Sequence, residues 1–243
     1  MRKTTDIGEV RRLARTFLMI EPSNTPYSPV IVQHPFTNSG LCVIKTDNEH
    51  QMLDITQKES NLLAWQKYIS GIIDQSNLTE IFNMFNPAYG LTFIKYAEPF
   101  LSQKDLSEML VQVWIQSENP NNDANVSKQD IRRLFERSDP AILMDDSERK
   151  ELSQLDDPVT VYRGVTQYNS ENIRAFSWTI DYDKAEWFAH RFNEEGTVYA
   201  AQIYKKHIFA LFNSRNEAEV ILDPQYLRGI EDIQIADTDI KLQ

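Results

Sequence analysis

The sequence predicts an α+β protein on two observations. From residue 59 to residue 155, apolar side chains recur at intervals of three and four, as they do along the buried face of a helix. After Pro158, apolar and polar side chains alternate, which is the period of a half-buried strand. Because the helical part precedes the strand-rich part and does not alternate with it, the pattern favours an α+β fold over a parallel, doubly wound sheet.

Residues 1–58 are mixed in character, and we treat them as an N-terminal extension without an assigned role. Residues 11–20 fit a short helix, and residues 22–29 form a loop punctuated by prolines. Residues 30–32 and 41–45 are predicted to be short strands, because both are runs of mainly apolar side chains.

Residues 59–243 are predicted to form one domain, whose helical half begins with a helix over residues 59–75. Two signals of the form Ser-X-X-Asp, beginning at Ser102 and Ser127, resemble capping boxes and precede two further helices. A last helix is predicted over residues 146–155, before an Asp-Asp-Pro sequence. The predicted parts of this domain are the helices of residues 59–155 and the strand-rich core of residues 158–243.

The strand-rich core is predicted to contain six strands and one helix. Asp181 is the expected N-cap of the helix. Its buried face is expected to consist of Ala185, Phe188, Ala189 and Phe192, which recur at helical spacing. The predicted strands are residues 159–162, 175–179, 197–203, 208–212, 219–222 and 233–236.

The composition argues against several common kinds of site. The formal net charge of −11 disfavours nucleic-acid binding, which needs a basic surface. The four histidines and the single cysteine, Cys42, do not fall at metal-ligand spacing, so no metal is expected. The glycines form neither a phosphate-binding P-loop nor a GxGxxG or GxSxG motif. The apolar stretch of residues 17–20 is far too short to span a bilayer, so we expect a cytoplasmic protein without a membrane partner.

Three short segments of the strand-rich core carry residues suited to chemistry on a nucleotide. Arg163 ends the first strand ahead of Gly164, and an arginine can hold a phosphate through paired hydrogen bonds. Residues 177–179, Ser-Trp-Thr, place two hydroxyls around an aromatic side chain. Glu217 and Glu219, if both are extended, lie on one face of a strand. A carboxylate bonded to a ribose hydroxyl can stabilise the oxocarbenium ion that forms as a glycosidic bond breaks.

An arginine on one strand, Ser-X-Thr on the next and Glu-X-Glu before a later strand resemble the R-S-E pattern of ADP-ribosyltransferases. This group includes bacterial toxins, phage-encoded enzymes and animal ecto-enzymes, and the resemblance covers residues 158–225. It implies a fold in which a helical N-terminal part packs on a mixed or antiparallel, split β-sheet. It also implies a mono-ADP-ribosyltransferase that takes NAD as substrate, releases nicotinamide and modifies a protein target, as phage or toxin effectors modify a bacterial protein.

The resemblance further implies a role for each residue of the motifs. Glu219 would bond a ribose hydroxyl and stabilise the transition state, and Glu217 would position or deprotonate the acceptor. A glutamate at position 217 implies that this acceptor is arginine. Ser177 would orient Glu219, and Arg163 would contact the phosphates or ribose of NAD. The other residues expected near NAD are Gly164, Trp178, Thr179 and Phe188. Arg215 and Asn216 would lie on the loop that meets the protein substrate.

Each motif taken alone also has a structural explanation. Arg163 can be a surface salt-bridge partner, residues 177–179 a half-buried strand, and the two glutamates a solvated strand face. The occurrence of all three in the family's order favours the transferase. Two alternatives stay open: an NAD glycohydrolase that uses water as acceptor, and a catalytically inactive binding protein on the same fold.

Overall fold

The computed structural model divides into two compact units, residues 1–138 and 139–243, and each is described by itself. The boundary expected after residue 58 does not coincide with this division. The N-terminal segment packs in the same unit as the helices that follow it; Arg11 Nη2, for example, donates to the Ser76 carbonyl at 2.8 Å. The described residues are 4–46, 49–117, 120–169, 172–191 and 195–233.

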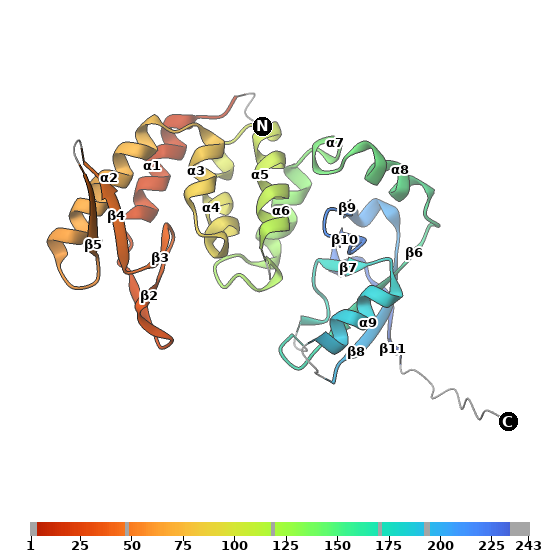
Figure 1. Ribbon diagram of the computed structural model, residues 1–243. Coiled ribbons are helices and arrows are strands. Elements are labelled where there is room, and N and C mark those ends of the chain that lie inside the picture. Colours follow the sequence, from red (N-terminus) through yellow and green to blue (C-terminus); the bar gives the residue numbers. More distant parts are fainter. Residues whose placement is uncertain (1–3, 47–48, 118–119, 170–171, 192–194, 234–243) are drawn as a thin grey trace. The chain divides into compact units, whose positions relative to one another are not determined.

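The N-terminal unit combines helices with two small antiparallel sheets of strand order β1-β2-β3 and β4-β5 (Figure 1). Its helices are α1 (Ile7–Leu18), α2 (Glu59–Gln75), α3 (Leu78–Met84), α4 (Gly90–Ala97), α5 (Gln103–Gln116) and α6 (Lys128–Arg137). Its strands are β1 (Ser23–Thr25), β2 (Ser28–His34), β3 (Thr37–Ser39), β4 (Leu41–Lys45) and β5 (His50–Asp54).

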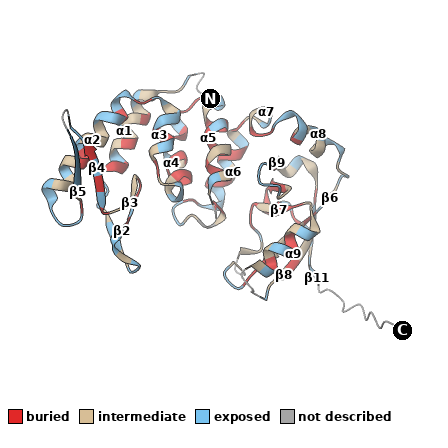
Figure 2. Cartoon of the chain, in the orientation of Figure 1, coloured by how far each residue is buried: buried red, intermediate tan, exposed pale blue. Residues whose placement is uncertain are grey.

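Two helices of this unit, α5 and α6, begin where local capping predicts. The Ser102 side chain accepts a hydrogen bond from the backbone N–H of Asp105 ahead of α5, and Ser127 accepts one from Asp130 ahead of α6. The apolar faces that follow these caps turn inward, where Trp114 of α5 and Leu134 of α6 are fully buried (Figure 2). Helix α2 has the bounds predicted from its apolar spacing.

The C-terminal unit is built on a six-stranded antiparallel sheet of order β11-β8-β6-β7-β10-β9. Its strands are β6 (Val159–Val165), β7 (Ser177–Thr179), β8 (Thr197–Ile203), β9 (Ile208–Phe212), β10 (Glu219–Leu222) and β11 (Arg228–Ile233). Its helices are α7 (Pro140–Leu143), α8 (Asp146–Gln154) and α9 (Tyr182–His190). The strand predicted over residues 233–236 begins earlier than expected, at Arg228, and residues 234–236 lie outside the described residues.

Helix α9 lies along one face of this sheet and contacts β6, β7 and β8 (Figure 1). The Asp181 side chain caps it by accepting hydrogen bonds from two backbone N–H groups of its first turn. Ala185 and Ala189 are buried against the sheet, whereas Phe188 is only partly buried. Phe192, predicted on the same buried face, lies outside the described residues.

Gly164 lies inside β6, where it pairs with Val198 of β8, so the first strand continues past Arg163 instead of ending there. A Cβ added at Gly164 would lie 2.1 Å from the Ala185 carbonyl oxygen and 2.5 Å from the Ala189 nitrogen. The glycine therefore allows the backbone of α9 to approach the sheet closely.

These helices and antiparallel sheets confirm the α+β class. Among the described residues, no helix combines the length and the apolar character that a membrane span requires.

Candidate active site

Three neighbouring strands of the large sheet carry the three sequence motifs. Arg163 lies in β6, Ser177 begins β7 and Glu219 begins β10, and β7 is the strand between the other two. The register places Ile221 opposite Ser177 and Glu219 opposite Thr179. Motifs that are separate in the sequence therefore meet along one part of the sheet.

The ladder between β6 and β7 consists of a single pair, Tyr162 with Thr179. Beyond that pair, the side chain of Arg163 connects the two strands, because its Nη1 donates to the Ser177 carbonyl at 2.5 Å. Arg163 thus contacts the backbone of Ser177, and the hydroxyl of Ser177 is itself expected to belong to the site.

Glu219 is a buried carboxylate with a different partner at each oxygen. Its exposed fraction is 6%. Ser177 Oγ donates to Glu219 Oε1 at 2.5 Å, and Arg215 Nη2 lies 3.5 Å from Oε2. A buried carboxylate is costly unless it is hydrogen-bonded and paired with a cation, so these contacts stabilise both its charge and its orientation. The contact at Oε2 is the longer of these two.

Glu217 is not extended, contrary to the simplest interpretation of Glu-X-Glu. Strand β10 begins only at Glu219, and the intervening Ala218 has a φ of 45°. This left-handed conformation is unusual for a residue with a side chain. Thr179 Oγ1 holds the loop by donating to the Glu217 carbonyl at 2.8 Å, and Ile180 N donates to the Ala218 carbonyl at 3.2 Å.

The two glutamates nevertheless meet at one cation. Arg215 Nη2 lies 3.1 Å from Glu217 Oε2 and 3.5 Å from Glu219 Oε2. The Glu217 side chain is 26% exposed, whereas that of Glu219 is 7% exposed. The more accessible carboxylate suits a group that exchanges a proton with an incoming molecule, and the buried one suits a fixed negative charge.

Arg163 is a cation in an environment that destabilises its charge. Burial lowers its pKa from 12.5 to about 10; Glu219 opposes this shift and Arg191 adds to it. Its Nε–H is buried and makes no hydrogen bond to any described residue. Buried N–H groups are nearly always paired, so a ligand anion would supply what this guanidinium lacks. The site thus offers an anionic group a buried cation with an unused donor.

A second cation near this site, Arg191, was not predicted. It directly follows α9, and its guanidinium carbon lies 5.3 Å from the centroid of the Phe188 ring. A basic residue at the C-terminal end of a helix is ordinary, so nothing in the sequence distinguishes Arg191. Its proximity to Arg163 concentrates positive charge on this side of the sheet.

The two candidate aromatic residues have different environments. Trp178 is 2% exposed, and its Nε1–H donates to the Ala175 carbonyl at 3.0 Å, so it is a core residue with a satisfied donor. Phe188 is partly exposed and lies against Arg191. Of the two side chains expected near NAD, Phe188 is the one that a ligand can reach.

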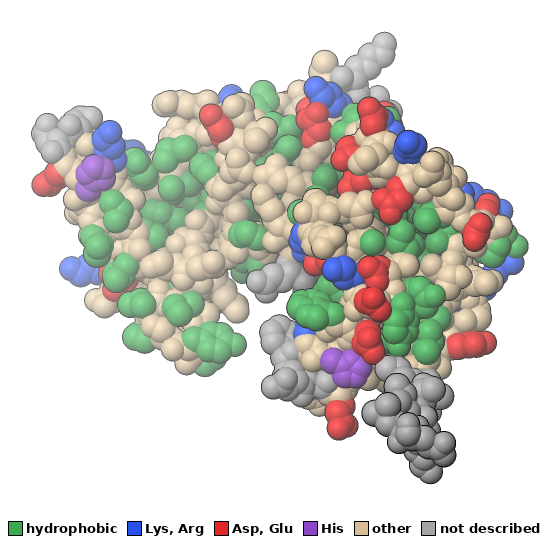
Figure 3. Space-filling model, turned by 45° about the vertical axis from the view of Figure 1, so that its right-hand side comes forward, with side chains coloured by type: hydrophobic (Ala, Val, Ile, Leu, Met, Phe, Trp, Pro, Cys, Tyr) green, Lys and Arg blue, Asp and Glu red, His purple; other side chains and the backbone are tan. Residues whose placement is uncertain are grey.

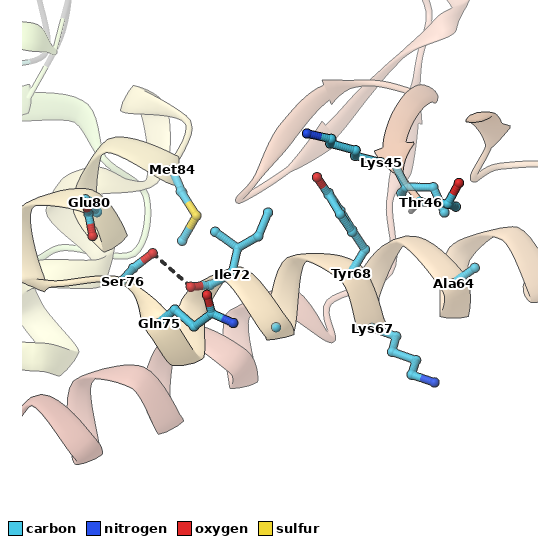
Figure 4. Close-up of a pocket in the computed structure, with 12 residues that line it drawn as sticks. Lys45, Thr46, Ala64, Lys67, Tyr68, Ile72, Gln75, Ser76, Glu80 and Met84 are labelled. Carbon is cyan, nitrogen blue, oxygen red and sulfur yellow. Dashed lines mark hydrogen bonds between the residues drawn. The ribbon is translucent and has the colours of Figure 1, made fainter. Parts of the chain in front are cut away.

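The N-terminal unit carries an open groove that contains none of these residues. It has a volume of about 920 Å³ and is formed by residues of β4, α2 and α3. In Figure 4, Tyr68 and Ile72 extend from α2 on the side where Lys45 lies, and Lys67 points away. The groove lacks the combination of arginine, hydroxyl and paired glutamates found on the large sheet.

The surface of the protein is rich in acidic side chains. Acidic side chains are prominent on the face seen in Figure 3, which accords with the net charge of −11. Among the described residues, no group of three or more His, Cys, Asp or Glu side chains is arranged to hold a metal ion.

Comparison with protein families, with curated proteins and with solved structures found no match to this chain.

Proposed function

We propose that the C-terminal unit is a mono-ADP-ribosyltransferase that cleaves NAD and transfers ADP-ribose to an arginine side chain of a protein. The observation that carries this proposal is the chain of hydrogen bonds from Arg163 through Ser177 to Glu219 across three adjacent strands. It combines a cation with an unsatisfied donor, a hydroxyl and an oriented carboxylate, which are the groups that NAD cleavage needs.

Each group has one task in the proposed reaction. Arg163 binds an NAD phosphate, whose negative charge compensates the positive charge of the buried guanidinium. Ser177 holds Glu219 so that Oε2 accepts a hydrogen bond from a ribose hydroxyl. The negative charge of Glu219 then stabilises the oxocarbenium-like transition state as nicotinamide leaves with the electron pair of the glycosidic bond. Glu217 accepts the proton that the acceptor guanidinium loses when its nitrogen bonds the ribose carbon.

The proposal is tested by incubating the purified chain with labelled NAD, agmatine as a small guanidinium acceptor, and a bacterial lysate. Glu219→Gln is expected to lower nicotinamide release by about 10²–10⁴-fold, since it removes the charge and preserves the shape. Glu231→Gln is the matched control, because Glu231 is an exposed glutamate on β11. Full activity of Glu219→Gln would overturn the proposal. Nicotinamide release without labelled agmatine or protein would identify a glycohydrolase instead.

A further inference from the structure

Arg215 lies where the proposed reaction requires the guanidinium of an acceptor. Its Nη2 is 3.1 Å from Glu217 Oε2, the carboxylate that would take the acceptor's proton. The same nitrogen is 3.5 Å from Glu219 Oε2, the oxygen that would bond the ribose. A substrate arginine would have to make these contacts to reach the reacting carbon, and an arginine of the chain itself already makes them.

The loop conformation directs Arg215 toward this position. Asn216 N donates to the Asn213 carbonyl at 2.8 Å, which closes a turn directly after β9. Asn216 and Ala218 both have positive φ, at 55° and 45°. Two such residues in one short loop reverse its course, so that Arg215 and Glu217 meet beside the start of β10. Strained conformations of this kind are concentrated at functional sites.

We propose that Arg215 is itself an acceptor, so that the enzyme attaches ADP-ribose to this residue of its own chain. This inference rests on the proposed function. When the ribose hydroxyl bonds Glu219 Oε2, it replaces the longer of the two Arg215 contacts. Arg215 then remains on Glu217, with its guanidinium next to the ribose carbon. Its fixed position gives it a high effective concentration relative to an external acceptor.

The transfer balances without a further reactant besides NAD. The bond between the ribose carbon and the nicotinamide nitrogen breaks, and nicotinamide leaves as a neutral molecule with the bonding electron pair. A lone pair on an Arg215 Nη forms the new bond to the same carbon. The proton lost from that Nη passes to Glu217. The products are the chain carrying ADP-ribose on Arg215 and free nicotinamide.

The test is to incubate the full chain with NAD and agmatine, and to locate ADP-ribose by peptide mass spectrometry while measuring nicotinamide. We expect ADP-ribose on Arg215 in the wild type and in Arg149→Lys, and its absence from that peptide in Arg215→Lys and Glu219→Gln. Arg149 is a suitable comparison because it also pairs with a carboxylate, that of Asp146, away from the site. Arg149 is expected to carry no ADP-ribose in the wild type.

The outcomes separate this inference from the proposed function. Nicotinamide release and agmatine modification without ADP-ribose on Arg215 would overturn the inference and leave the proposed function standing. Absence of nicotinamide release from the wild type would overturn both. A mass-tagged Glu219→Gln chain mixed with wild type must remain unmodified at Arg215, because the geometry places the acceptor within one chain. Modification of the tagged chain would overturn the intramolecular transfer.

Discussion

Ser177 and Glu219 are joined by a hydrogen bond of 2.5 Å between the hydroxyl and Oε1, although they begin different strands. The hydroxyl at the start of β7 therefore orients the carboxylate at the start of β10. Glu219 is almost completely buried, and Arg215 lies 3.5 Å from its other oxygen, Oε2.

Replacement of Ser177 by alanine tests this relationship. We expect Ser177→Ala to lower kcat for nicotinamide release about tenfold or more, because a hydrogen bond to a charged group contributes roughly 1.5–3 kcal/mol. Ser177→Thr, which keeps the hydroxyl, should retain more activity than the alanine variant. Ser214→Ala, at an exposed turn position, serves as the control in the same assay. Equal kcat values for Ser177→Ala and wild type would show that Glu219 does not depend on this bond.

Arg163→Lys tests the role of the buried guanidinium. Lysine keeps the charge but cannot form the planar, paired hydrogen bonds of arginine. We expect the KM for NAD to rise about tenfold, equivalent to about 1.4 kcal/mol, with a smaller change in kcat. Steady-state kinetics measures both constants. Arg174→Lys is the comparison, because Arg174 bonds the Pro224 carbonyl in the same unit. A change confined to kcat would place Arg163 outside NAD binding.

Gly164 is predicted to be essential for packing of α9 on the sheet. Gly164→Ala introduces a Cβ that would overlap backbone atoms of α9, so we expect a loss of about 1–3 kcal/mol or more in the free energy of unfolding. Gly71→Ala should have the opposite sign, about 0.5–1 kcal/mol of stabilisation, because Gly71 lies within α2 with no atom within 4 Å of the added Cβ. Calorimetry of both variants checks the pair. Equal changes in the free energy of unfolding for the two variants would contradict the close approach of α9 to the sheet at Gly164.

Asp130 is predicted to make the N-terminal unit sensitive to acid. Burial by itself would raise the pKa of Asp130, but hydrogen bonds from Ser127, Lys95 and Arg133 outweigh it and hold this pKa well below its usual value. A depressed pKa in the folded state stabilises the protein above the pKa of the unfolded chain, about 3.9. This contribution is lost as the pH falls below about 4 toward the folded-state pKa.

Urea denaturation at a series of pH values measures the effect of Asp130. We expect Asp130→Asn to lower the free energy of unfolding at pH 7 by about 1–3 kcal/mol and to weaken its dependence on acid. Asp74→Asn is the control, because the Asp74 side chain is 53% exposed where it pairs with Arg15. Parallel curves for Asp130→Asn and wild type between neutral and acidic pH would contradict this assignment.

Much of the secondary structure could be predicted because its causes are local. The bounds of α2, the caps at Ser102 and Ser127, and Asp181 as the N-cap of α9 follow from spacing and from side chains next to the helix ends. The prediction did not include the short strands β1, β3 and β5 or the short helices α3, α4 and α7. Such elements are too short for a period to stand out, and packing against neighbours stabilises them.

The site was predictable as a set of residue types but not as an arrangement. The three motifs indicate Arg163, Ser177, Glu217 and Glu219. The left-handed Ala218, the double contact of Arg215 and the position of Arg191 beside Phe188 could not be predicted from the motifs. Each depends on how a loop or a helix end packs against the sheet.

By itself, the sequence determined the α+β class, the order of the helical and strand-rich parts and the residue types available for chemistry, because periodicity, capping and composition act over a few neighbouring residues. Only the tertiary structure decided that β7 lies between β6 and β10, and that an arginine of the loop lies between two glutamates. Ser177 and Glu219 are 42 residues apart in the chain. A contact over that separation depends on strand pairing and burial throughout the sheet, which no local pattern specifies.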